Sequence, residues 1–107
     1  MTVSDLIKDS GFRSLTLPSP EREIDGVYIG DLLSWVMGRA KVDSAWITIM
    51  SNINVIAVAT LSDVSAVIFA EDVVPDGDII RAAEEKGVNL IVSPYPAYET
   101  AMKLSGI

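Results

Sequence analysis

The sequence contains neither cysteine nor histidine. The absence of cysteine excludes disulfide frameworks and thiol chemistry, and the two absences together exclude zinc sites built from these residues. Without histidine, every mechanism that needs an imidazole base is excluded as well. A chain without cysteine also suits a reducing compartment, so we expect a cytoplasmic protein.

Basic residues are few. Lys and Arg number 8 against 15 Asp and Glu, which gives a formal net charge of −7. Phosphate backbones and anionic lipid surfaces repel such a chain, so we expect no nucleic-acid partner and no membrane binding. The acidic excess is interpreted as a solvated surface, because no closely spaced acidic loop resembles a calcium site.

One long run, residues 44–62, carries no charge at all. Its length could cross a bilayer. However, Ser51, Asn52 and Asn54 lie in its middle, where polar groups are expensive in a membrane. We therefore interpret the run as two buried strands, residues 45–50 and 55–60, joined by a polar loop.

The 107 residues suffice for one domain with a hydrophobic core and not for two. Short runs rich in Val and Ile alternate with helical patterns, most clearly in the second half of the chain. This rhythm predicts a single α/β domain over residues 1–107, with a mainly parallel or mixed sheet of five to six strands covered by helices. An antiparallel or irregular pairing is expected within residues 44–70, where the rhythm breaks.

The expected elements follow from apolar spacing and from cap residues. Strands are expected at residues 13–17, 24–29, 45–50, 55–60, 65–70 and 89–92. Helices are expected at residues 3–9 with Thr2 or Ser4 as cap and Gly11 as terminator, and at 32–39 with Asp31 as cap. Two more are expected between Asp76 and Gly87 and from Ser93-Pro94 onward.

No catalytic residue, metal ligand or cofactor site is predicted. The chain lacks the glycine-lysine pattern of a P-loop, and Gly26 and Gly30 do not complete a dinucleotide-binding pattern. Neighbouring carboxylates such as Glu71-Asp72 are interpreted as solvated caps rather than as an acid–base pair. A magnesium site at Glu71-Asp72, serving a small enzyme, stays open as a minor alternative.

A candidate ligand site follows from the topology. In open α/β sheets, ligands bind outside the carboxyl ends of parallel strands. The predicted strand ends and the loops after them supply six candidate ligand-binding residues: Gly30, Asp31, Ser51, Asn52, Asn54 and Ser93. The alternative is that Asp31 and Ser93 are ordinary helix caps, and that the two asparagines are ordinary turn formers.

Several segments carry a family resemblance. They are GVYIGDLLS (residues 26–34), AWITI (45–49), AVIF (66–69), PDGDIIRAAEEKG (75–87), SPY (93–95) and YETA (98–101). From about residue 24 to its end, the chain resembles the DRTGG domain family, which is similar to the N-terminal domain of HPr kinase/phosphorylase. Domains of this family also occur beside CBS domains and in some phosphotransacetylases.

The resemblance implies a small regulatory α/β domain that can mediate dimer contacts and can bind a small ligand. It does not imply kinase activity, because the P-loop domain of HPr kinase has no counterpart here. The residues that give the family its name are not retained. Its Asp-Arg-Thr segment corresponds to residues 50–53, which lack the arginine, and Glu71 and Asp72 replace its Gly-Gly. An anion would therefore lose its main charge partner, and close backbone approach would be blocked.

Two functions are expected on these grounds. The first is a stand-alone regulatory or interaction module without catalytic activity, acting as a homodimer or on a protein partner. The alternative is a sensor of a small ligand, of nucleotide or acyl-phosphate type, that uses the strand-end crevice.

Overall fold

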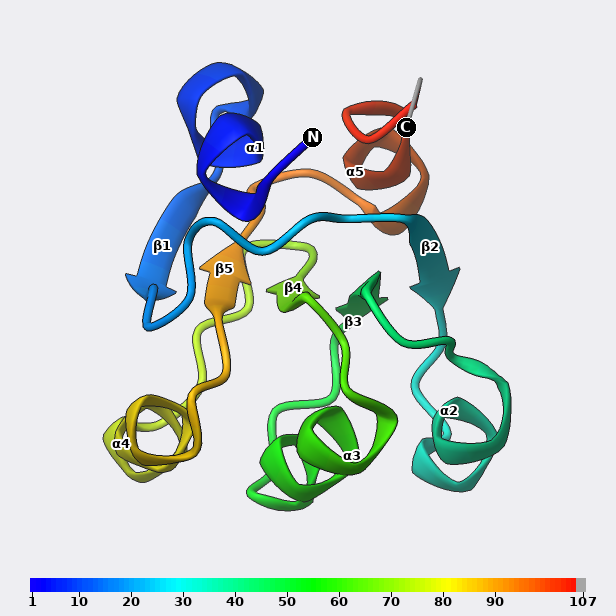
Figure 1. Ribbon diagram of the computed structural model, residues 1–107, viewed down its shortest axis with the longest axis vertical. Helices are drawn as coiled ribbons and strands as arrows, with labels where there is room; N and C mark the ends of the chain where they lie inside the picture. The colour runs from blue at the N-terminus through cyan, green and yellow to red at the C-terminus, as the bar shows by residue number, and fades with distance from the viewer. Residues whose placement is uncertain (106–107) are drawn as a thin grey trace.

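Helices cover both faces of one central sheet (Figure 1). The computed structural model describes residues 1–105. Along the chain, its elements are α1 (Val3–Ser10), β1 (Arg13–Thr16), β2 (Gly26–Ile29), α2 (Leu33–Arg39), β3 (Ser44–Thr48), α3 (Asn54–Ser62), β4 (Ala66–Phe69), α4 (Gly77–Lys86), β5 (Leu90–Val92) and α5 (Ala97–Met102).

The sheet has five strands in the order β1-β5-β4-β3-β2. Strands β2 to β5 are parallel, because a helix returns the chain after each of β2, β3 and β4. Strand β1 pairs with β5 in the antiparallel sense. The predicted mixed sheet is therefore confirmed, but its antiparallel pairing lies at the β1 edge and not within residues 44–70.

The core lies on both faces of the sheet. Trp46, Phe69 and Leu90 pack in a buried cluster with residues of α2, α3 and α4. Ile47 and Ile68 belong to a second cluster, which includes residues of α1 and of the segment after β5. Every residue of β3, β4 and β5 is buried. This explains why these strands are nearly apolar throughout, as the sequence suggested.

The strand predicted at residues 55–60 is wrong, because these residues lie in α3. Their β-branched side chains imitate a strand pattern. The geometry of the sheet requires a helix here. Strands β3 and β4 are adjacent and parallel, so a crossover element has to return the chain between them. Val55, Ile56, Val58 and Ala59 form the buried side of that helix.

Several predicted helix ends are confirmed. Thr2 caps α1, and it exchanges hydrogen bonds with Asp5 in a capping box. Gly11 and Gly87 end α1 and α4 with left-handed φ values of 81° and 75°. None of the helices within residues 1–105 combines the length and the hydrophobicity that a bilayer-spanning segment needs.

The last helix begins later than predicted. Helix α5 starts at Ala97 with Pro96 as its N-cap, and not at Ser93-Pro94. A residue that precedes proline is disfavoured in helical conformation, so Pro96 keeps Tyr95 out of the helix. The spacing in the sequence predicts Tyr98, Ala101 and Met102 on the inner face of this helix, but Tyr98 and Met102 are exposed.

Candidate functional site: the strand-end crevice and the α3–α4 groove

The carboxyl ends of β4 and β5 form a switch point of the fold. The chain leaves β4 towards α4 on one face of the sheet, and it leaves β5 towards α5 on the opposite face (Figure 1). Between such diverging loops an α/β sheet usually opens a ligand crevice. The crevice predicted from the sequence should therefore be deepest between these two strands.

In this chain, the loops after β4 and β5 are bonded to each other instead. The backbone N–H groups of Glu71 and Asp72 donate to the carbonyl oxygens of Tyr95 and Ser93, each at 2.9 Å. A salt bridge of 3.1 Å between Asp72 and Arg13 of β1 adds a further tie. These contacts occupy the place where a ligand would enter between the two strands.

Ser93 is fully buried and has its own partners. Its hydroxyl group lies 2.7 Å from that of Thr100 in α5 and accepts the N–H of Tyr95 at 3.2 Å. The predicted role of Ser93 as a helix cap is wrong, because α5 begins four residues later. In this position Ser93 fastens α5 to the end of β5.

Asp31 joins the ends of two strands. One of its carboxylate oxygens accepts the hydroxyl of Thr48 at 2.7 Å and the backbone N–H of Ile49 at 2.9 Å. Leu32 is the N-cap of α2, so the predicted capping role of Asp31 is wrong. The carboxylate turns towards the end of β3 because two donors are available there, and a charge-assisted hydrogen bond is stronger than a neutral one.

Gly30 lies where a side chain would collide with its neighbour. A Cβ at this position would come within 2.9 Å of the ring of Tyr28. Its carbonyl oxygen accepts the indole N–H of the buried Trp46 at 2.9 Å. The position of the Tyr28 ring therefore explains the glycine.

The other candidates, Ser51, Asn52 and Asn54, lie exposed at the turn from β3 into α3. The side-chain oxygen of Asn52 accepts the backbone N–H of Asn54 at 2.9 Å, which is an Asx turn. Its amide also lies 3.3 Å from the sulfur of Met50. This arrangement matches the turn-former alternative.

A small cavity of about 170 Å³ opens at the ends of β2, β3 and β4. It is lined by Ile29, Asp31, Ile47, Thr48, Ile49, Ala70, Glu71 and Ala97. Of the six residues predicted to bind a ligand, Asp31 alone is in this lining. Both charged side chains of the lining, Asp31 and Glu71, are acidic.

The family model of the DRTGG domain matches residues 21–107. The chain belongs to the DRTGG domain family. The resemblance seen in the sequence is therefore confirmed.

The DRTGG domain described here is also similar to a solved structure, the CBS and DRTGG domains of the regulatory region of Clostridium perfringens pyrophosphatase. That structure is a complex with the activator diadenosine tetraphosphate. The TM-score is 0.76 at 12% sequence identity, and the match covers 96% of this chain. This chain spans 45% of the length of that protein. No curated protein sequence matches it.

The two positions that the sequence resemblance matches to the family's Gly-Gly have a conformation that glycine adopts without strain. Glu71 and Asp72 have φ values of 60° and 58°, in the left-handed region. A residue with a Cβ is disfavoured there by roughly 1–2 kcal/mol. The turn after β4 is therefore built from two residues with side chains in a conformation that favours glycine.

A larger hollow, the α3–α4 groove, lies on the opposite face of the sheet from α5. Its volume is about 380 Å³, and it is lined by Ile53, Ile56, Ala57, Thr60, Leu61, Ala82 and Lys86. Sequence reasoning missed this groove, because it assigned residues 55–60 to a buried strand. The signal was nevertheless present: the uncharged run continues through the whole of α3.

Proposed function

We propose that this chain is a regulatory module that self-associates and has no catalytic activity of its own. Its membership of the DRTGG family supports a regulatory role. The observation that carries the self-association is the outer side of α3, which is uncharged and exposes large apolar side chains.

Helix α3 carries no charged residue although only one side of it is buried, and its exposed side combines apolar residues with the polar Asn54 and Thr60. On its outer side, Ile53 is 52% exposed and Leu61 is 72% exposed, and Ala57 between them is exposed as well. A surface helix of a globular domain ordinarily carries charged and polar residues on the side away from the core, so large apolar side chains on the outer side of α3 are typical of a covered position. Exposed apolar patches of this kind mark contact surfaces between proteins.

The proposed lack of catalysis rests on how the polar groups at the strand ends are used. Asp31 already accepts two hydrogen bonds, and Asp72 is paired with Arg13. The hydroxyl group of Ser93 is buried against that of Thr100. These groups hold the strand ends and loops together. Because a general acid or a nucleophile needs a partner group that is free to take part in the reaction, they do not form a catalytic pair.

Sedimentation equilibrium of the full chain in the micromolar range tests the proposal. We expect a concentration-dependent dimer. A strict monomer throughout that range, with no protein recovered in pull-down experiments, would contradict self-association. Turnover by the purified chain would contradict the proposed lack of catalysis.

A second candidate function is the sensing of a small ligand of nucleotide or acyl-phosphate type. The observation that favours it is the cavity of about 170 Å³ at the strand ends. Asp31 and Glu71 would repel a phosphate there, so an uncharged part of such a ligand would have to enter first. Chemical-shift mapping with adenine nucleotides and acetyl phosphate tests this candidate. Shifts at Asp31, Thr48 and Glu71 would support it, and none at millimolar ligand would refute it.

A further inference from the structure

Strand β2 lies at one edge of the sheet, and within residues 1–105 no strand pairs with its outer side. Directly after β2, the backbone N–H of Gly30 donates to the carbonyl oxygen of Ile47 in β3. Backbone groups of successive strand residues point to opposite sides, so the N–H and C=O groups of Val27 and Ile29 point away from β3. Groups in this alternating arrangement pair with an extended chain segment.

The side chains of β2 do not protect this edge. Exposed edge strands ordinarily carry lysine or proline, or a bulge that interrupts them. Residues 26–30 contain neither lysine nor proline, and β2 pairs with β3 in continuous register. Val27 and Ile29 are 38% and 50% exposed, on the face of the sheet opposite α2, because Tyr28 between them packs towards the cluster that includes α2. They therefore present an apolar face to an added strand.

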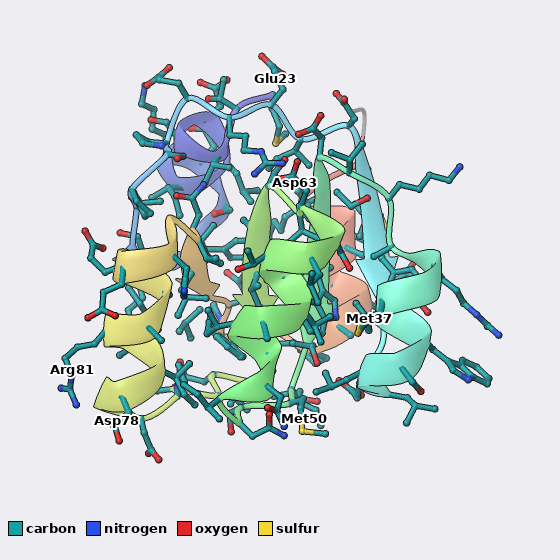
Figure 2. All side chains as sticks on the ribbon, turned by 60° about the horizontal axis from the view of Figure 1, so that its bottom comes forward. Glu23, Met37, Met50, Asp63, Asp78 and Arg81 are labelled. Atoms are coloured by element: carbon teal, nitrogen blue, oxygen red, sulfur yellow. The ribbon has the colours of Figure 1, made fainter. Side chains whose placement is uncertain are left out.

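On the other face of the sheet, the outer flank of α2 borders the same edge. Met37 lies on the side of α2 that faces α3 (Figure 2). Trp35 and Arg39 are each about half a helical turn away from Met37, so they lie on the flank that faces away from α3. Trp35 is 52% exposed, and the guanidinium carbon of Arg39 lies 3.9 Å from the centre of its ring.

The charge of α2 and its ends is opposite to that of the chain as a whole. Residues 32–42 include Arg39 and Lys41 and no acidic residue, whereas the whole chain has a net charge of −7. Within residues 1–105, neither of these two cations forms an ion pair. Acidic side chains therefore fit the α2 side of the β2 edge, and apolar side chains fit the opposite side.

We infer that the β2 edge binds an extended segment of another protein, in which acidic and apolar side chains alternate. The segment lies beside β2 as an added strand and exchanges hydrogen bonds with Val27 and Ile29. Its acidic side chains face Arg39, and its apolar side chains continue the apolar face of the sheet. This inference goes beyond the proposed self-association, which uses the outer side of α3.

A second copy of β2 does not fit this edge. Neighbouring helices pack about 8–10 Å apart and neighbouring strands only about 4.8 Å apart, so the outermost helix of a layer reaches beyond the outermost strand. Helix α2 is the outermost helix on its face, at the β2 edge (Figure 1). Pairing two copies of β2 would bring both α2 helices into the same space, whereas a segment without a covering helix avoids this collision.

Amide hydrogen exchange followed by NMR tests the pairing residue by residue. The probe is a synthetic peptide of about eight alternating valine and glutamate residues with blocked ends, and the control peptide has lysine in place of glutamate. At millimolar glutamate peptide, exchange at the N–H groups of Val27 and Ile29 should slow by at least about fivefold. The N–H of Tyr28 faces β3 and should not respond. The lysine peptide should leave all three unchanged, because it brings like charge to Arg39.

Two variants test the backbone and the charge separately. Val27→Pro removes an outward N–H and keeps the ladder to β3, so it should fold, as circular dichroism would check. It should weaken binding of the glutamate peptide by at least about tenfold. Arg39→Gln should weaken binding by about threefold to tenfold. Its matched control is Lys86→Gln, which removes a cation from the last turn of α4 and should leave binding unchanged.

The outcomes separate this inference from the proposed function. Protection of Val27 and Ile29 that is lost in Val27→Pro supports the β2 edge as the binding surface. Absence of protection at millimolar glutamate peptide, or protection that Val27→Pro leaves intact, overturns the inference and does not affect self-association through α3. Equal binding of the two peptides overturns the preference for acidic side chains. A monomeric chain that binds the glutamate peptide at β2 supports the inference and contradicts self-association.

Discussion

The backbone N–H of Glu71 donates to the carbonyl oxygen of Tyr95 at 2.9 Å, which joins the loop after β4 to the loop after β5. These two loops lead to opposite faces of the sheet, so the bond spans the point where an α/β fold usually admits a ligand. Glu71 makes it from a left-handed conformation, with φ at 60°. The closed crevice thus depends on a turn that costs conformational energy.

Replacing Glu71 by glycine should therefore stabilise the domain. Glycine relieves a left-handed penalty of roughly 1–2 kcal/mol and loses about 0.5–1 kcal/mol through its greater freedom in the unfolded chain. We expect a net gain of about 0.5–1 kcal/mol in the free energy of unfolding, measured by urea denaturation.

Glu71→Ala is the matched control for this change. Within residues 1–105, the side chain of Glu71 makes no hydrogen bond or ion pair, so its removal alone should change little. Alanine keeps the Cβ and therefore the strain. A glycine variant that is less stable than the alanine variant by about 0.5–1 kcal/mol would mean that the left-handed turn stores no energy.

Ser93→Ala should destabilise the domain although Ser93 lies at a predicted ligand site. The change removes the hydroxyl that lies 2.7 Å from that of Thr100 and accepts the N–H of Tyr95. The hydroxyl of Thr100 keeps its hydrogen bond to the carbonyl oxygen of Tyr95, but the N–H of Tyr95 loses its acceptor. Leaving a buried donor without a partner costs about 1–3 kcal/mol. Thermal or urea unfolding measures the loss. An unchanged stability would contradict the structural role and return Ser93 to the list of ligand contacts.

The stability contributed by the α1 capping box should depend on pH. The hydrogen bond from the backbone N–H of Thr2 lowers the pKa of Asp5 below its ordinary value of 3.8. The ionised carboxylate therefore stabilises the folded chain above this pH, and the contribution is lost as the pH falls through the lowered value.

The corresponding measurement compares the wild type with Asp5→Ala across pH. The difference in their free energies of unfolding should be constant at neutral pH and should narrow below pH 3.8. Asp9→Ala removes another carboxylate of α1 without touching the cap and serves as the control. A difference that stays constant down to the acid transition would show that the cap does not involve the ionised group.

Most of the fold could be predicted because local signals and tertiary requirements agreed. Helix α1 begins after Thr2, and Gly11 and Gly87 end α1 and α4, as their residue types suggested. The error at residues 55–60 arose because the local and tertiary signals differ there. A row of β-branched residues favours a strand, but the chain has to return between two parallel strands, and this requirement makes the segment a helix.

The candidate site was less predictable, because side-chain partners depend on contacts distant in the chain. The position of Asp31 in the sequence is typical of a helix cap, yet its carboxylate accepts a hydrogen bond from the hydroxyl of Thr48 at the end of β3. Similarly, Ser93 finds Thr100 because Pro96 delays the last helix. The α3–α4 groove could not be predicted while residues 55–60 were assigned to a strand. The one signal for it in the sequence was the absence of charged residues from the segment that forms α3.

Arg22 is expected to be the most sensitive surface cation of the chain. Its guanidinium group binds Asp43 at 2.9 Å and Asp63 at 2.8 Å, and thereby joins the loop before β2 to the starts of β3 and β4. Both aspartates have left-handed backbones, with φ at 65° and 54°, so the pairing holds two strained turns together.

Arg22→Ala should lower the free energy of unfolding by roughly 1–3 kcal/mol. Arg22→Lys keeps the charge but loses the planar fork, so it should recover only part of that loss. Urea denaturation at low and at high salt separates the two contributions, because salt screens the Coulombic part and leaves the geometric part. Full recovery by lysine would mean that charge alone, and not the forked geometry, stabilises these turns.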